Sequence, residues 1–267
     1  MIEITIGSAS HIGMEKNENQ DYHAYVVPDN GKLNTKGIIL ALADGMGGMG
    51  GGSLASRTAV DALIETYYND DNSGEVTESL VKAFLKANDE VIAKGTQHIE
   101  TARMGSTLIA VVIKKNKIYY AHVGDSRGYI IYGNDITQFT EDHSYVNSLV
   151  KAGVITAEQA QTHPERHVII RAIGLNSELT VDTSQIDQHI KKNQYILLCC
   201  DGLHGVVSNE VILSTINEYR EPDVVCQKLV DKANQNGGPD NITVLIARID
   251  KVDLISSLTN RFLSLVG

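Results

Sequence analysis

The apolar positions of the 267-residue chain fall into two kinds of segment, short continuous runs and sets at helical spacing. Runs with the length of buried strands occupy 22–27, 37–43, 107–113, 118–123, 128–132, 195–200 and 242–249. Apolar residues recur every three or four positions over 53–67 and 77–94, which predicts a helix in each segment. A helix pair is predicted over 209–219 and 223–234.

The connections between these segments favour antiparallel sheets. The polar turn 114–117 joins two apolar runs directly, as in a β-hairpin. Residues 143–166 are polar and are predicted to form short helices and loops over the surface. We find no internal repeat and no Pro-rich linker. We therefore expect an α+β fold with helices packed outside antiparallel sheets, as one domain over 1–250 followed by a tail at 251–267.

Five aspartates stand at the ends of the predicted strands. Asp44, Asp125 and Asp201 each follow an apolar run. Asp21 and Asp240 each stand just before one. In an antiparallel sheet the end of one strand lies beside the start of its neighbour, so the five carboxylates can converge on one rim. Any one of them alone is more simply explained as a turn residue, but the five together favour a site.

Carboxylates that crowd together repel one another, and a divalent cation removes that repulsion. Oxygen-only ligation suits Mg²⁺, Mn²⁺ or Ca²⁺ rather than Zn²⁺ or Cu²⁺. The glycines that follow Asp44 and Asp201 would let the backbone turn sharply and bring a carbonyl close to a ligand. The pattern therefore predicts a metal site lined by aspartates.

Charge and cysteine content exclude several other classes of protein. The formal net charge is −10, and an acidic surface repels nucleic acid and anionic membranes, so neither is expected as a partner. The cysteines are Cys199, Cys200 and Cys226, and none forms a CxxC pair. This argues against a disulfide framework or a zinc site and favours a reducing, cytoplasmic setting. We expect neither a signal peptide nor a membrane span.

Eight motifs follow one another along the chain. They are Gly13…Lys16…Asn19-Gln20-Asp21, Ala43-Asp44-Gly45-Met46-Gly47-Gly48…Gly52…Ala55-Ser56, Met104-Gly105-Ser106-Thr107, Val123-Gly124-Asp125-Ser126-Arg127, Asp142-His143-Ser144, His163-Pro164-Glu165-Arg166…Arg171-Ala172-Ile173-Gly174, Cys200-Asp201-Gly202-Leu203 and Asp240-Asn241-Ile242-Thr243. In this order they resemble the PPM family of metal-dependent serine/threonine protein phosphatases (protein phosphatase type 2C), in its compact bacterial form. The resemblance runs over residues 5–250.

The resemblance implies a four-layer α-β-β-α sandwich, in which two antiparallel sheets pack face to face and helices cover both outer sides. It also implies two Mn²⁺ or Mg²⁺ ions, which Asp44 would bridge, with the Gly45 carbonyl binding one of them. Asp201 and Asp240 would complete the protein ligands of the other ion. Asp125 resembles the family's ligand for a third, weaker ion.

The resemblance also implies an activity. Asp21 would hold a metal-bound water, and Lys16 stands where the family's phosphate-gripping arginine usually stands. The implied reaction is hydrolysis of phosphoserine and phosphothreonine in proteins by a metal-bridged hydroxide, in opposition to a bacterial serine/threonine kinase. Cys199 and Cys200 lie inside an apolar run and are expected to be core, so a cysteine-based phosphatase is not expected. A monomer is expected.

Three departures from the family pattern affect these expectations. Lys16 keeps a positive charge but lacks the bidentate fork of arginine, so weaker phosphate binding is expected unless Lys16 is only a solvated surface lysine. Met46 leaves the site without a histidine general acid, and His143 and His163 could either assist or have structural or flap roles. Gly205 stands where many relatives carry a carboxylate, so a third ion should be weakly held.

Two other functions stay open at this point. A non-catalytic or sensor member of the same fold would bind phosphoprotein or metal, and an unrelated phosphohydrolase would act on small molecules. The intact Asp44, Asp201 and Asp240 favour the enzyme. The tail at 251–267 has apolar residues at helical spacing, so it could be an amphipathic helix that docks on a partner or a membrane surface, or one that folds back on its own domain.

Overall fold

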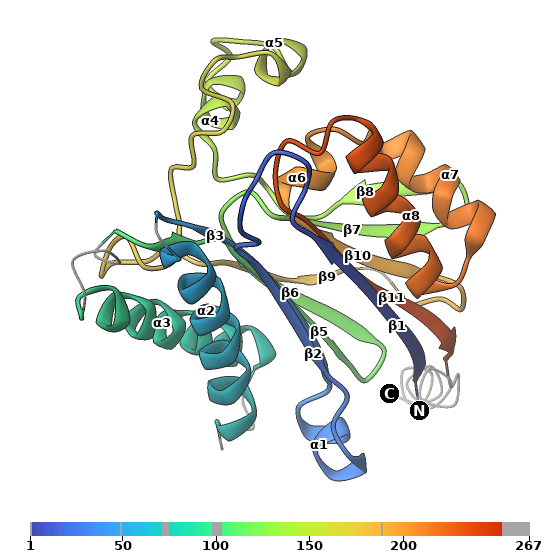
Figure 1. Cartoon of the computed structure of the whole chain (residues 1–267). Coiled ribbons are helices and arrows are strands. Elements are labelled where there is room, and N and C mark those ends of the chain that lie inside the picture. Colours follow the sequence, from blue (N-terminus) through green and yellow to red (C-terminus); the bar gives the residue numbers. More distant parts are fainter. Residues whose placement is uncertain (1, 49, 71–74, 98–102, 188, 253–267) are drawn as a thin grey trace.

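The apolar run of strand β3 (Ile38–Met46) is buried on both faces, which places it inside a layered fold. The computed structural model describes residues 2–48, 50–70, 75–97, 103–187 and 189–252. In this part of the chain two antiparallel sheets pack face to face with helices outside both of them (Figure 1). The predicted α+β sandwich of four layers is therefore confirmed. Residues 253–267 of the predicted tail lie outside the described residues.

Each sheet combines strands that are distant in the sequence. The first contains β1 (Glu3–His11), β7 (Arg127–Tyr132), β8 (Asp135–Gln138), β10 (Tyr195–Cys199) and β11 (Ile242–Lys251). Its strand order is β1-β11-β10-β7-β8. The second contains β3 with β2 (Asp21–Val26), β4 (Gly105–Ser106), β5 (Leu108–Lys114), β6 (Lys117–Val123) and β9 (Asp182–Ile186). Its order is β2-β3-β5-β6-β9, and β4 pairs with the end of β3.

The longer helices cover the outer faces of the two sheets (Figure 1). Helices α2 (Gly51–Asn69) and α3 (Val76–Gly95) pack on the second sheet, and α6 (Asp201–His204), α7 (Asn209–Tyr219) and α8 (Pro222–Gln235) pack on the first. The short α1 (Asn30–Thr35) lies in the connection from β2 to β3. Helices α4 (Tyr145–Lys151) and α5 (Ala157–Gln161) project from the opposite end of the sandwich (Figure 1).

Side-chain alternation along β3 builds two of the three hydrophobic layers. Ile39 and Ala41 belong to the layer under α2 and α3. Leu40 and Leu42 belong to the layer between the sheets, where Leu198 of β10 lies in the same cluster. Burying a Leu or Ile side chain contributes about 1.5–3 kcal/mol. A strand that is buried on both faces therefore has to be apolar at every position, which explains the continuous run in the sequence.

The hairpin predicted at 114–117 is confirmed. Lys115 and Asn116 connect β5 to β6 and have positive φ angles of 48° and 60°, as a two-residue type I′ turn requires. Strands β1, β8 and β9 are not among the predicted elements. Strand β9 reads Asp-Thr-Ser-Gln-Ile and is only partly buried, and β1 is an edge strand with partly exposed side chains. Neither has the continuous apolar run that marks a buried strand.

Candidate metal centre

The ends of neighbouring strands bring the five predicted aspartates together at one rim of the sandwich. Asp21, the first residue of β2, pairs directly with Asp44 near the end of β3. In the other sheet Asp201 follows β10, and Asp240 precedes the antiparallel neighbour β11. Asp125 lies in the turn between β6 and β7. Burial, and then the negative charges of the other four aspartates, raise the pKa of Asp44 well above its usual range.

Backbone hydrogen bonds fix the position of Asp44. Its N–H donates to the Thr107 Oγ1 at 2.8 Å, and its carbonyl accepts from the Thr107 N–H at 2.9 Å. The Ser106 hydroxyl donates to the same carbonyl at 2.9 Å. The hydroxyls of Thr107 and Ser126 lie 2.7 Å apart, which links the end of β3 to the loop that carries Asp125. The carboxylate of Asp44 is therefore placed through the main chain.

The carboxyl group of Asp21 is buried, and neither of its oxygens has a hydrogen-bond partner among the described residues. Burial is the main cause that raises its pKa to about 7. The nearby Thr243 hydroxyl and Cys200 thiol oppose this rise, but neither has hydrogen-bond geometry toward it. The charges of Asp201 and Asp240 add to the rise. A carboxyl group in this setting holds a proton unless a cation compensates its charge.

Asp125 and Asp201 each have a buried Oδ1 that lacks a partner among the described residues. Burial, followed by the charges of Asp201 and Asp142, raises the pKa of Asp125 to about 7. Burial acts in the same direction on Asp201, but His167 lowers the pKa of that carboxyl overall. The Nδ1 of His167 lies 3.9 Å from Asp201 Oδ2, which is an electrostatic contact and not a hydrogen bond. His167 belongs to the α4–α5 segment (residues 144–170), so this segment reaches the cluster.

Lys16 also lies at the cluster, with its Nζ 2.7 Å from Asp240 Oδ1. Partial burial alone would lower the pKa of Lys16, but the hydrogen bond and charge of Asp240 and the charges of Asp201 and Asp44 raise it. The ammonium group is therefore positive at neutral pH. The structure places Lys16 in an ion pair beside the aspartates, and its predicted contact with substrate phosphate stays a prediction.

Asn241 has a role that the last motif alone does not reveal. Its Oδ1 accepts from the Gln20 N–H at 2.8 Å, and its Nδ2 donates to the carbonyls of Ile12 and Glu18 at 2.8 and 2.9 Å. This single buried amide holds the loop 12–20 against the start of β11. Asparagine suits the position because it has both an acceptor and two donors. Its place directly after a predicted ligand is the sequence signal for this role.

Close packing of the main chain explains two of the glycines. A Cβ on Gly45 would collide with the Gly52 carbonyl, and a Cβ on Gly202 would collide with the Asn241 carbonyl. Neither Gly45 nor Gly202 is among the glycines with positive φ. The expectation that they permit a sharp turn is therefore wrong, and the physical requirement is space for a neighbouring strand or helix.

The structure also defines the surroundings of His143, His163, Gly205 and the cysteines. His143 is buried, with its Nε2 3.1 Å from Asp182 Oδ2, and His163 accepts from the Glu165 N–H at 3.1 Å. These contacts favour structural roles for both. Gly205 caps α6 and has no side chain to offer an ion. Cys199 and Cys200 are buried in the core, as predicted, and Cys226 is buried there as well.

The donor set fits a hard divalent cation. Four buried carboxylate oxygens lack partners among the described residues, and they belong to Asp21, Asp125 and Asp201. An unpaired buried carboxylate is costly, whereas a cation close to several such oxygens offsets their charge. Because the donors are all oxygen, Mn²⁺ and Mg²⁺ suit the site better than Zn²⁺. The cluster therefore has the features of a metal centre.

Comparison with known proteins agrees with this geometry. A profile of the protein phosphatase 2C family matches residues 9–234. The serine/threonine phosphatase stp of Listeria welshimeri is 34% identical over 211 residues, which are 78% of this chain and 83% of that protein. The protein phosphatase PhpP of Streptococcus pneumoniae is 34% identical over 250 residues, which are 93% and 98% of the two chains.

A solved structure with bound metal shares the fold. The catalytic domain of the serine/threonine phosphatase PstP, in complex with two manganese ions, has a TM-score of 0.78 and 31% sequence identity over 94% of this chain and all of that chain. The fold is thus that of a metal-dependent phosphatase, and the oxygen-lined cluster is compatible with this class of protein. The chain belongs to the protein phosphatase 2C family. In the described part of the chain no helix has the length and apolar character needed to cross a membrane.

Proposed function

We propose that this protein-serine/threonine phosphatase works with two Mn²⁺ or Mg²⁺ ions held by its aspartate cluster. The observation that carries the proposal is a set of buried carboxylate oxygens on Asp21, Asp125 and Asp201, beside Asp44, that have no hydrogen-bond partner in the described part of the chain. Protons would neutralise Asp21 and Asp125 only below about pH 7, the value to which the pKa of each is raised, and the pKa of Asp201 is lowered. Divalent cations would do so at physiological pH.

Each side chain has a proposed task at the site. Asp44 would contact both ions, and the Gly45 carbonyl would bind one of them. Asp201 and Asp240 would serve as ligands of the other. When bound, two such ions polarise a phosphate ester and activate water for attack on phosphorus. Asp21, which pairs with Asp44 between β2 and β3, would orient a water molecule and accept its hydrogen bond.

Lys16 and Asp125 would act at the margin of the site. The Lys16 ammonium is held 2.7 Å from Asp240, and its half-exposed side chain can turn toward a phosphoryl oxygen of the substrate. Asp125 would bind a third ion weakly, because Gly205 supplies no second carboxylate. The buried cysteines take no part, because burial raises the pKa of Cys199 to about 12 and leaves it a thiol.

The test is hydrolysis of p-nitrophenyl phosphate and of a phosphothreonine peptide across a series of Mn²⁺, Mg²⁺ and Ca²⁺ concentrations. We expect metal-dependent turnover of both substrates, with activity in Asp201→Asn at least about 100-fold lower because a ligand charge is lost. Metal binding without turnover would instead indicate a sensor of the same fold. Faster turnover of nucleotides than of the peptide would indicate a phosphohydrolase of small molecules.

The physiological proposal follows from the substrate class. An enzyme that removes phosphate from serine and threonine in proteins opposes a serine/threonine kinase of the same bacterial cell, and we propose that it does so in the cytoplasm as a monomer. The acidic chain, with a net charge of −10, supports a site built for cations and not for nucleic acid. Dephosphorylation of the autophosphorylated kinase by the purified enzyme, and sedimentation at the mass of one chain, would test these two points.

A further inference from the structure

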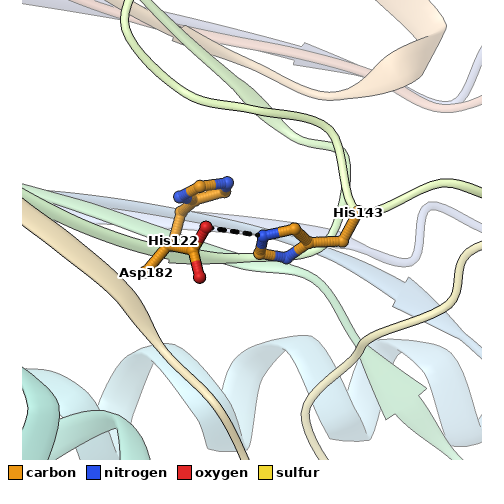
Figure 2. Close-up of side chains that lie close together, drawn as sticks. All are labelled: His122, His143 and Asp182. Atoms are coloured by element: carbon orange, nitrogen blue, oxygen red, sulfur yellow. Dashed lines mark hydrogen bonds and ion pairs between the residues drawn. The ribbon is translucent and has the colours of Figure 1, made fainter. Parts of the chain in front are cut away.

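A second cluster of titratable side chains lies outside the aspartate site. His122 of β6, His143 and Asp182 of β9 place one ligand atom each within 4.8 Å of one another. Figure 2 shows the two imidazole rings with the carboxylate of Asp182, which bonds to His143. The rings of His122 and His143 are stacked, with centroids 4.5 Å apart and planes 19° apart. Two histidines and one aspartate have the residue types of a transition-metal site.

The hydrogen bonds argue against a metal ion in this second cluster. The Gly124 N–H donates to His143 Nδ1 at 3.0 Å, so in the neutral ring Nε2 carries the hydrogen and donates to Asp182 Oδ2 at 3.1 Å. His143 therefore has no lone pair directed at a metal. The Arg171 Nη1 donates to Asp182 Oδ1 at 2.6 Å. It also lies 3.0 Å from His143 Nε2, which in this tautomer is a contact and not a hydrogen bond, because both nitrogens are donors. A positive group already occupies the space beside the carboxylate.

The cluster lies where the α4–α5 segment (residues 144–170) leaves and rejoins the sandwich. His143 is the residue before this segment, and Arg171 is the residue after it. The two ends run side by side: the Ile170 N–H donates to the His143 carbonyl at 2.9 Å, and the Tyr145 N–H donates to the Val168 carbonyl at 2.8 Å. Asp182 therefore bonds both ends of the segment from a strand of the second sheet.

His143 also connects this junction to the metal centre. Its side chain accepts from the Gly124 N–H, and its own N–H donates to the Gly124 carbonyl at 2.9 Å. Gly124 directly precedes Asp125. The α4–α5 segment also contacts the metal centre near its C-terminal end, where His167 Nδ1 lies 3.9 Å from Asp201 Oδ2. One set of contacts thus fixes both the base of the segment and the loop of a proposed metal ligand.

We propose that His143, Arg171 and Asp182 form a clamp that sets the orientation of the α4–α5 segment over the aspartate cluster. This orientation determines how tightly a phosphoprotein binds and has little effect on the binding of a small phosphate ester. The three residues are positioning residues, since none belongs to the aspartate cluster of the proposed metal centre. His122 supports the clamp by stacking on His143 and by its Nε2 contact with the Glu141 carbonyl at 2.8 Å. The proposal rests on the proposed phosphatase function.

The decisive variant is Asp182→Asn, which keeps the shape of the side chain and removes the charge that holds Arg171. We expect the KM for a folded phosphoprotein substrate to rise roughly fivefold, a modest factor because the Arg171–Asp182 pair is partly exposed. The kcat for that substrate and both constants for p-nitrophenyl phosphate should change less than about twofold. The matched control is Asp61→Asn on the exposed face of α2, which should leave all four constants unchanged.

A second readout does not depend on activity. Amide hydrogen exchange at Tyr145 and Ile170 should be faster in Asp182→Asn than in the parent, because the clamp protects these base hydrogen bonds. Unchanged exchange together with unchanged KM would overturn the proposal, even if the enzyme is fully active. If instead the parent shows no metal-dependent phosphatase activity, the proposed function fails, and the exchange rates alone decide whether the clamp exists.

Two further experiments address a variant that does not fold and the alternative of a zinc site. If Asp182→Asn does not fold, Arg171→Lys replaces it, because lysine keeps the charge but loses the planar fork and should show the same changes at smaller size. Zinc titration of the parent and of Asp182→Asn separates the clamp from a metal site. Equal zinc uptake supports the clamp, and loss of one equivalent in the variant would show that the second cluster is a zinc site and overturn the proposal.

Discussion

The buried negative charge of the aspartate cluster should lower the free energy of unfolding of the metal-free protein. The variant Asp21→Asn, which removes one of these charges, measures the size of this effect. The pKa of Asp21 is raised from an ordinary value of 3.8 to about 7, chiefly by burial. A difference of about three pKa units corresponds to about 4 kcal/mol, at about 1.4 kcal/mol for each unit. Asparagine removes the charge at nearly constant shape, but its buried amide would itself need hydrogen-bond partners, which costs about 1–3 kcal/mol.

The direction of the pH dependence follows from the raised pKa. A carboxyl group whose folded-state pKa lies above its unfolded-state value destabilises the folded state fully above about pH 7, and this destabilisation declines as the pH falls toward 3.8. We therefore expect Asp21→Asn to increase the free energy of unfolding by about 1–3 kcal/mol at pH 8 without metal. At pH 5 the increase should be less than half as large.

The assay is urea unfolding of parent and variant in EDTA at pH 8 and pH 5, with Asp61→Asn, an exposed aspartate of α2, as the control. With saturating Mn²⁺ the order should reverse, because cation binding stabilises the parent more than a variant that lacks a carboxylate of the cluster. A variant that is less stable than the parent in EDTA at pH 8 would refute the reasoning. In that case hydrogen bonding at Asp21, and not repulsion and burial, would control the site.

Two shorter predictions concern phosphate and metal binding. Lys16→Arg should lower the KM for p-nitrophenyl phosphate roughly threefold, because arginine can bind a phosphoryl group with two parallel hydrogen bonds; an unchanged KM would mean that Lys16 does not contact the substrate. Metal binding should release protons below about pH 7, because burial and neighbouring charges raise the pKa of Asp125 to about 7 and hold that of Asp44 well above its usual range. Calorimetry in two buffers of different ionisation enthalpy at pH 6.5 measures this release, and an identical binding heat in both buffers would contradict the prediction.

Much of the site could be predicted because its residues are tied to strand ends. The run 38–43 is apolar at every position since both faces of β3 are buried, and such a run identifies where the strand lies. Asp44 and Asp201 are then found by their place at the end of a run. Antiparallel pairing of β2 with β3 places Asp21 opposite Asp44. This contact can therefore be predicted without knowing the conformation of the residues between the two strands.

The contacts that could not be predicted come from polar segments without a periodic pattern. Strand β9 is short and polar, so nothing in the sequence reveals that Asp182 faces His143. His167 lies in a loop whose path over the cluster depends on the α4–α5 segment as a whole. The ion pair of Lys16 with Asp240 requires loop 12–20 to be held by Asn241, which is a long-range contact.

The same burial that stabilises the sandwich prepares its site for cations. Strand β3 lies between two hydrophobic layers, and Asp44 near its end directly follows the buried residues Leu42 and Ala43. The main chain around Asp44 is satisfied by Ser106 and Thr107, so the fold stays ordered at this point while the carboxylates repel. Destabilisation is thus confined to side-chain charge, which a divalent cation can cancel without moving the backbone. The affinity of the site for cations is therefore increased by the repulsion between its carboxylates, because a bound cation removes that repulsion while the packed core keeps the carboxylates in place.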